Sequence, residues 1–217
     1  MIGVVIPAHN EEACLDACLH AVRAAALHPA LRSEPVRIVA VLDDCSDGTE
    51  AVARAHPVQV LHVQARKVGA ARAAGAQHLL EAGARWLAFT DADTVVSPGW
   101  LAAQLGLGAQ AVCGSVEVDW SAGEHGEPVR QCFERHYRDA DGHRHIHGAN
   151  LGVCALAYRR AGGFAPLACS EDVALVEALQ RSGATIAWSA APRVLTSART
   201  DARARGGFGD TLLAMAP

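Results

Sequence analysis

The sequence predicts an α/β fold with a mainly parallel central sheet. Apolar runs typical of buried strands alternate with helical segments over residues 2–90. Polar residues follow these runs instead of interrupting them, as expected where parallel strands end at a ligand-binding edge. A hydrophobic content of 51% with 19% charged residues in a chain of 217 is that of a folded protein, long enough for one substantial core. We therefore expect a single α/β domain.

The first half carries the clearest pattern. Its predicted strands are apolar runs rich in β-branched residues: 2–6, 36–42, 58–63 and 86–90. The predicted helices lie between them: 11–27 with Asn10 as its N-cap, 48–56, and 68–82. A strand–helix alternation of this kind indicates a parallel sheet covered on both faces.

The second half is less regular. We predict one strand over 110–120, an amphipathic helix over 127–139 and a polar loop over 141–150. A further helix opens at Ser170 and stops before Gly183, followed by short strands over 185–190 and 192–197. Because there is neither an internal repeat nor a linker-like stretch, we expect residues 1–217 to form one domain.

Charge and composition exclude some functions. A net charge of −4 and a pI near 6.2 argue against a broad basic face, so we expect no nucleic-acid partner. We expect neither a signal peptide nor an integral membrane segment, because no apolar stretch has the required length and flanks. Seven cysteines without a C-x-x-C pair are typical of reduced thiols. A cytoplasmic protein is therefore expected, either free or peripheral to the inner face of the membrane.

Acidic and polar residues follow three of the predicted strands, over 7–11, 43–47 and 91–93. Asp91 and Asp93 alternate at a strand end, so both carboxylates can project to the same side. Mg²⁺ or Mn²⁺ commonly takes one or two carboxylates and fills its shell with water and phosphate oxygens. The alternative is ordinary turn chemistry before Pro98 and Gly99. Three polar clusters on one sheet edge favour a ligand site.

At this point the sequence resembles a known family. The segments VVIPAHNEE, VLDDCSDGT, RKVGAARAAG and FTDADT resemble the nucleotide-sugar half of family 2 glycosyltransferases, which have the Rossmann-like GT-A fold. The later segments HGANLGVCALAYRRAGGF and SEDVALVEAL resemble the acceptor side of that family, and the order of motifs matches over residues 2–190. The resemblance implies one GT-A domain with a donor half over 1–95 and an acceptor half over 96–217.

The resemblance also implies donor-site roles. A nucleoside pocket is implied for four residues of the first motif: Pro7, Ala8, Asn10 and Glu11. Asp44 would accept a base N–H, while Asp43 supports the loop. Lys67, Gly69 and Arg72 would lie near the phosphates, although a solvated position is the alternative for Arg72. Further donor contacts are implied for Asp91, Ala92, Asp93 and Asn150. Asp93, assisted by Asp91, would hold a divalent metal, Mn²⁺ or Mg²⁺.

Glu171 and Asp172 form the implied acid motif. Transfer to a hydroxyl needs a base to take its proton, and by resemblance this is Asp172, with Glu171 orienting the acceptor or the loop. The alternative is that both carboxylates only stabilise the first turn of a helix. Attack on the anomeric carbon from the opposite face would invert its configuration, although related GT-A enzymes also achieve retention.

Two further segments are candidates for the site. His143, His145 and His147 alternate and can bind a metal, although histidines in a polar loop more often face solvent. By resemblance His147 lies beside the donor sugar. Many GT-A enzymes add a late histidine as a metal ligand, but no histidine follows His147 here. Arg199 and Arg203 in the tail are candidate phosphate or acceptor contacts; a solvated C-terminus is the alternative.

The resemblance as a whole implies a glycosyltransferase (EC 2.4 class) with a UDP- or GDP-sugar donor and an unknown acceptor. Two rivals differ in class. A nucleotidyltransferase would also use metal-binding aspartates but usually shows a Gly-rich basic loop after the first strand, where this chain has PAHNEE. A non-catalytic nucleotide-sugar-binding module would need no base at Asp172.

Overall fold

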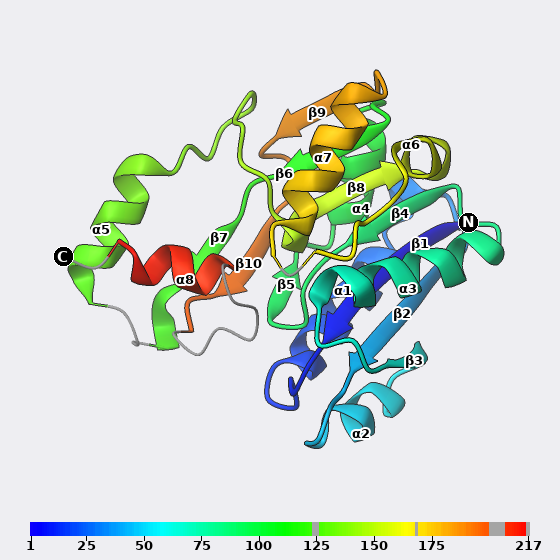
Figure 1. Ribbon diagram of the computed structural model, residues 1–217, viewed down its shortest axis with the longest axis horizontal. Helices are drawn as coiled ribbons and strands as arrows, with labels where there is room; N and C mark the ends of the chain where they lie inside the picture. Colours follow the sequence, from blue (N-terminus) through cyan, green and yellow to red (C-terminus); the bar gives the residue numbers. More distant parts are fainter. Residues whose placement is uncertain (123–125, 168, 200–206, 216–217) are drawn as a thin grey trace.

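The computed structural model describes residues 1–122, 126–167, 169–199 and 207–215, and its centre is a seven-stranded sheet (Figure 1). The strand order is β3-β2-β1-β4-β8-β6-β9. These strands are β1 Ile2–Ala8, β2 Val36–Asp43, β3 Gln59–Val63, β4 Trp86–Phe89, β6 Ala111–Gly114, β8 Leu151–Cys154 and β9 Ile186–Ser189. Only β8 runs antiparallel to its sheet neighbours. The prediction of a mainly parallel central sheet is confirmed.

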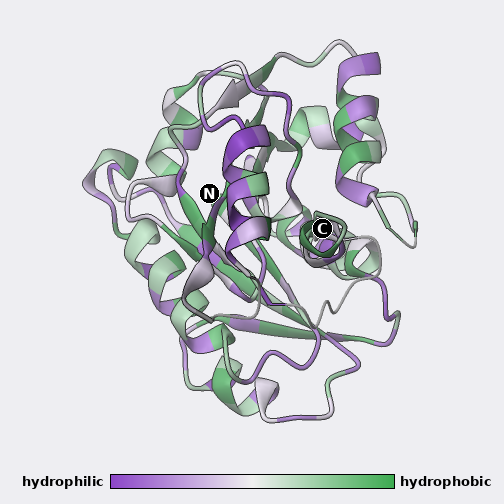
Figure 2. Ribbon diagram, turned by 90° about the vertical axis from the view of Figure 1, so that its left-hand side faces the viewer, coloured by the Kyte–Doolittle hydropathy of each residue, from purple (hydrophilic) through white to green (hydrophobic). Residues whose placement is uncertain are grey.

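Helices cover both faces of this sheet. One face packs against α1 Leu15–Ala26, α2 Thr49–Arg54 and α4 Trp100–Gly106, and the other against α3 Val68–Glu81, α6 Ala155–Ala161 and α7 Glu171–Arg181. Alternating side chains of each strand supply the two cores: Val4 and Ile6 lie in the first, Val5 in the second. Figure 2 shows the hydrophobic residues gathered on the central strands.

Gly75 lets the α3 helix pack closely on the sheet. A Cβ atom at this position would lie 2.6 Å from Val5 Cγ1 and 2.9 Å from Val41 Cγ2. The absence of a side chain therefore lets the helix backbone approach β1 and β2. This close packing fixes the start of α3, and with it Arg72, beside the carboxyl edge of the sheet.

A smaller sheet with strand order β5-β10-β7 adjoins that edge. Its strands are β5 Thr94–Val96, β7 Glu117–Asp119 and β10 Val194–Ser197. Two helices, α5 Glu127–His136 and α8 Phe208–Leu213, pack on it in a small separate core, on the left of Figure 1. Because the Ser197 N–H donates to the Asp93 carbonyl (3.3 Å), the end of β10 lies against the Asp91–Asp93 segment.

Several element predictions are confirmed and others are wrong. The four strands of the first half are present, and α3 and α7 lie within one residue of their predicted ends. The single strand predicted over 110–120 is two strands, β6 and β7, in different sheets. Asn10 is not the N-cap of α1, which begins at Leu15 after Cys14. The described residues also contain three 3₁₀ turns: Pro29–Leu31, Trp120–Ala122 and Gly148–Asn150.

No helix within the described residues combines the length and the apolar character needed to cross a bilayer.

Candidate active site

The loops that follow β1 and β2 are tied together at the carboxyl edge. Asn10 adopts a left-handed backbone (φ 55°), and its Oδ1 accepts a hydrogen bond from the Ser46 N–H (2.8 Å). Glu12 accepts from the Gly48 N–H (2.9 Å). Asn10 thus serves the loop rather than the helix, because its side-chain acceptor is used by the neighbouring segment. These contacts place the first two polar clusters side by side.

Asp43 fixes the segment that leads into α3. Its Oδ1 accepts from the N–H groups of Ala65 (2.7 Å) and Arg66 (2.9 Å), and its Oδ2 from the N–H of Lys67 (2.9 Å). The prediction that Asp43 supports the loop is confirmed. Asp44, the predicted partner of the base, forms an exposed ion pair with Arg66. The side chain of Lys67 is exposed.

Replacing Asp43 by alanine should destabilise the protein by roughly 3 kcal/mol, because three backbone N–H groups lose a charged acceptor. Urea unfolding measures this change. Asp43→Asn is the matched variant: its remaining carbonyl oxygen can still accept at the Oδ1 position, so it should lose less than alanine. Equal losses for the two variants would contradict a role based on these hydrogen bonds.

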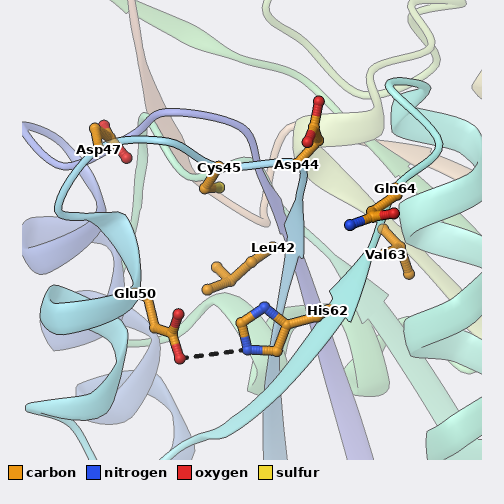
Figure 3. Close-up of a pocket in the computed structure, with 8 residues that line it drawn as sticks. All are labelled: Leu42, Asp44, Cys45, Asp47, Glu50, His62, Val63 and Gln64. Atoms are coloured by element: carbon orange, nitrogen blue, oxygen red, sulfur yellow. Dashed lines mark ion pairs between the residues drawn. The ribbon is translucent and has the colours of Figure 1, made fainter.

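A small hollow lies beside these loops, between β2, β3 and the start of α2. Its volume is about 150 Å³. Figure 3 shows the side chains that line it: Leu42, Asp44, Cys45, Asp47, Glu50, His62, Val63 and Gln64. His62 and Glu50 form an ion pair across its floor (3.4 Å), whereas Asp44 points away from them. The hollow is polar and adjoins the predicted base partner without being centred on it.

Arg72 connects the acidic motif after β4 with the acidic motif at the start of α7. Its guanidinium forms ion pairs with Asp91, after β4, and with Glu171, at the start of α7. The residue is only 3% exposed, so the alternative of a solvated helix position is excluded. Gly148 and Gly69 make room for this bridge: a Cβ at Gly148 would overlap the guanidinium, and one at Gly69 would lie 2.9 Å from Glu171 Cβ. Burial raises the pKa of Glu171, while the Arg72 charge opposes that rise.

Asp93 lies beside a second arginine bridge. Arg199 donates to both carboxylate oxygens of Glu11 (2.7 and 2.6 Å) and lies 3.1 Å from Asp93 Oδ2. Burial, opposed by Arg199 but reinforced by Asp91 and Glu11, raises the pKa of Asp93 to about 6. Asp91 is more open than Asp93, with side-chain exposures of 33% and 15%.

The charge balance at this edge suits a divalent cation. Four carboxylates, on Glu11, Asp91, Asp93 and Glu171, share the two guanidinium groups of Arg72 and Arg199. Partly buried carboxylates in excess of their partners are unfavourable unless a cation compensates them. Oxygen ligands are those that Mg²⁺ and Mn²⁺ prefer. The donor set therefore fits the metal predicted from the sequence.

Asp172 is held at the first turn of α7. Its Oδ2 accepts from the Gly148 N–H (2.8 Å) and its Oδ1 from the Val173 N–H (2.8 Å). A helix N-terminus favours a carboxylate, which agrees with the stabilising role given as the alternative. The side chain is nevertheless partly exposed, and its neighbour Glu171 belongs to the Arg72 bridge. The two predicted motifs therefore meet at one site.

The three alternating histidines stack instead of converging on a shared point. His145 lies between His143 and His147, with ring centroids 5.4 and 6.0 Å away, and stacks on Tyr137 at 4.1 Å. Burial lowers the pKa of His147 to about 3. As the Tyr137 hydroxyl accepts from the Val116 N–H (2.8 Å), its proton is free to point to Nε2 of the neutral His147 (2.9 Å). This arrangement favours a packing role for the three rings.

Asn150 is fully buried, and its amide is used inside the protein. Its Oδ1 accepts from Trp100 Nε1 (2.9 Å), and its Nδ2 donates to the carbonyls of Ser115 (2.7 Å) and Pro192 (2.9 Å). The Asn150 side chain has no exposed surface and connects the two sheets through these hydrogen bonds. We therefore assign it no contact with the nucleotide-sugar donor.

The remaining predicted residues lie at or behind the same edge. Pro7 and Ala8 end β1, and Ala92 separates the two aspartates; all three are buried, as is Gly69 at the start of α3. Only their backbone or limited surface is available to a ligand. Arg203 lies outside the described residues.

A separate group of possible metal ligands was missed by sequence reasoning. Asp16 and His20 on α1 and His56 after α2 have ligand atoms within 4.8 Å of one another, with Asp16 Oδ1 2.9 Å from His56 Nε2. The Asp16–His20 spacing of four residues on a helix was the available signal. No member is a predicted donor residue, so we treat this group as distinct from the Asp93 site.

Comparison with solved structures identifies the fold as GT-A. S. aureus TarS (residues 1–349), solved with UDP-GlcNAc, superposes with a TM-score of 0.69 at 13% identity, covering 95% of this chain and 61% of that one. The mannosyltransferase PcManGT from Pyrobaculum calidifontis, solved with GDP-Man and Mn²⁺, gives 0.66 at 16% identity, covering 93% and 58%. Glucosyl-3-phosphoglycerate synthase from Mycobacterium tuberculosis, solved with phosphoglyceric acid, gives 0.64 at 19% identity, covering 99% and 79%. The chain thus spans about three fifths of the length of the TarS fragment and of the PcManGT chain.

A family match defines the class of this chain more closely than the fold alone. The family described as "Glycosyl transferase family 2" matches residues 3–159, which is well over half of the chain. The chain belongs to glycosyl transferase family 2. No curated protein sequence matches it.

Proposed function

We propose that the protein transfers a sugar from a nucleotide-diphosphate donor to an acceptor hydroxyl, with inversion at the anomeric carbon. The observation that carries the proposal is the Arg72 bridge, which brings Asp91 and the Glu171–Asp172 pair to one edge of the sheet. The bound ligands of the solved relatives, UDP-GlcNAc and GDP-Man with Mn²⁺, support a UDP- or GDP-sugar donor and a divalent metal. The donor half would be residues 1–95 and the acceptor half 96–217.

Each part of the edge has a proposed task. The nucleoside lies over the ends of β1 and β2, near Asn10 and Asp44, and the diphosphate near Lys67 and the start of α3. Asp93, with Asp91, would hold the metal, which when bound would neutralise negative charge on the diphosphate. Arg72 is buried between two carboxylates, so its task is to orient them rather than to contact phosphate directly.

Asp172 is the proposed base. It takes the proton of the acceptor hydroxyl while the acceptor oxygen forms a bond to the anomeric carbon. The bond from that carbon to the phosphate oxygen breaks, and the nucleoside diphosphate leaves with the electron pair. The Gly148 and Val173 N–H groups keep the carboxylate pointing to one side. Glu171 orients the segment through its ion pair with Arg72.

Thermal stabilisation by nucleotides tests the donor site directly. With Mn²⁺, either UDP or GDP at about a hundred times its dissociation constant should add roughly 2.7 kcal/mol to the free energy of unfolding. Removing Mn²⁺ with EDTA, or replacing Asp93 by alanine, should abolish most of this gain. Asp119→Ala is the matched control. It also removes a carboxylate, but Asp119 lies on β7, accepts a hydrogen bond from the Ser121 N–H and is not a proposed donor residue, so the gain in stability should be kept.

Stabilisation without sugar transfer to any acceptor would favour the non-catalytic binding module. Stabilisation by a nucleoside triphosphate, with release of pyrophosphate from that triphosphate when a sugar phosphate is added, would favour the nucleotidyltransferase. If folded wild-type protein gains no stability from any nucleotide, the proposed donor site is wrong.

A further inference from the structure

Arg199 links two loops that supply the proposed metal site. It follows β10, near the end of the described chain, and reaches back to Glu11 after β1 with two hydrogen bonds of 2.7 and 2.6 Å. The same Nη2 atom lies 3.1 Å from Asp93 Oδ2. Glu11 is 6% exposed, so this contact is sheltered from solvent. A bidentate ion pair that is shielded from solvent has a specific geometry, unlike most surface ion pairs.

This position puts a fixed positive charge on the carboxylate that would hold the metal. A metal–carboxylate oxygen distance is about 2.1 Å for Mg²⁺. A metal ion bound to Asp93 would therefore lie close to the Arg199 guanidinium, because both would contact the same carboxylate. The two cations would repel each other strongly at low effective dielectric. Arg199 can give up Asp93 without losing its anchor, because its two bonds to Glu11 involve the other carboxylate.

A diphosphate changes this balance. It brings negative charge to the same edge, and the second N–H group of Nη2, which Glu11 does not use, can donate a charge-assisted hydrogen bond to a phosphate oxygen. With the donor bound, both the metal and the guanidinium have an anion to contact, and the repulsion between them is offset. Without the donor, Asp93 can satisfy only one of the two cations.

On the proposed function, we propose that Arg199, anchored by Glu11, is a positioning residue that makes metal and diphosphate bind together. It competes with the free metal ion for Asp93 and turns its Nη2 toward a phosphate oxygen when the diphosphate arrives. The consequence is that the metal binds weakly alone and tightly with the nucleotide. If Arg199 only held its own segment against the loop after β1, the affinities for metal and nucleotide would not be coupled.

The experiment compares Mn²⁺ binding with and without nucleotide in wild type and Arg199→Gln. Free Mn²⁺ is followed by electron paramagnetic resonance, and nucleotide affinity by calorimetry at saturating Mn²⁺. In Arg199→Gln we expect Mn²⁺ alone to bind at least about tenfold tighter, because a neighbouring positive charge is gone. The nucleoside diphosphate should bind at least about tenfold more weakly, because a charged phosphate contact is lost.

Arg193→Gln is the matched control. Arg193 precedes β10, and its ion pairs are with Glu117 and Asp139 rather than with the proposed donor residues. It should change neither affinity. Arg199→Lys keeps the charge without the fork, so it should leave Mn²⁺ binding weak while lowering nucleotide affinity; it also serves if the glutamine variant does not fold.

The outcomes separate the two proposals. If wild type binds nucleotide with Mn²⁺ but Arg199→Gln binds Mn²⁺ alone no tighter, this inference is overturned and the proposed function stands. If wild type binds no nucleotide in the presence of Mn²⁺, the proposed donor site fails and this inference fails with it. A purely structural contact would not make Arg199→Gln bind Mn²⁺ more tightly and the nucleoside diphosphate more weakly.

Discussion

Replacing Arg72 by methionine should lower the free energy of unfolding by about 3–5 kcal/mol. Arg72 is 3% exposed, and its guanidinium compensates two carboxylates, Asp91 and Glu171, which a methionine would leave without a positive partner. Removing one member of a buried ion pair typically costs this much, since the remaining charge stays desolvated. Chemical denaturation of wild type and variant at neutral pH measures the difference.

Arg85→Met provides the matched control. Arg85 also binds a carboxylate with two hydrogen bonds, to Glu34 at 2.7 and 2.5 Å, but its side chain is 56% exposed. An exposed pair of this kind contributes about 0–1 kcal/mol, so Arg85→Met should be nearly neutral. The double variant Arg72→Met with Glu171→Gln should lose less than the sum of its parts, because one stranded charge is removed. Equal losses for Arg72→Met and Arg85→Met would contradict the bridge.

The first half of the fold follows from local sequence. Its strands are continuous apolar runs, and each is separated from the next by a helix-length segment, so a parallel sheet was predictable without any tertiary information. The carboxyl-edge location of the polar clusters follows from the same rule. Asp43 and the acidic pair at residues 91 and 93 therefore lie where the pattern places them.

The second half depends on contacts that local sequence does not reveal. The apolar run over 110–120 reads as one strand, but it divides at residues 115 and 116. There the Ser115 carbonyl accepts from Asn150 and the Val116 N–H donates to Tyr137. Strand β8 was not predicted, because its LGVC sequence contains a glycine, a residue disfavoured in strands. Partners far apart along the chain redirect both segments.

Arg72 shows the same limit within the site. Its helix is rich in alanine and gives no strong amphipathic signal, so a solvated position and a phosphate contact were both reasonable predictions. The deciding contacts come from Asp91 and from Glu171, which lies 99 residues away. Only the packing of α3 and α7 on one face of the sheet brings these residues together. Motif spacing predicted the members of the candidate site but not which of them pair.

Replacing Asp172 by asparagine should lower kcat for sugar transfer by about 10²–10⁴-fold, the usual contribution of a positioned general base. The donor should bind with unchanged affinity, because the asparagine carbonyl oxygen can still accept from the Gly148 N–H that now holds Oδ2. Kinetics with the nucleotide sugar identified by stabilisation, alongside direct donor binding, measure both quantities. Loss of rate without loss of binding separates proton transfer from a structural cap of α7.

Glu177→Gln tests whether any neutralised carboxylate on α7 has the same effect. Glu177 lies on the same helix, is exposed, and contacts Arg181 at 3.7 Å, so its loss should leave kcat unchanged. The anomeric configuration of the product, read by NMR, supplies an independent check, since a base that activates the acceptor for direct attack requires inversion. A retained configuration, or an Asp172→Asn variant with wild-type kcat, would show that Asp172 does not deprotonate the acceptor. The Gly148 contact would then be what explains the position of this carboxylate.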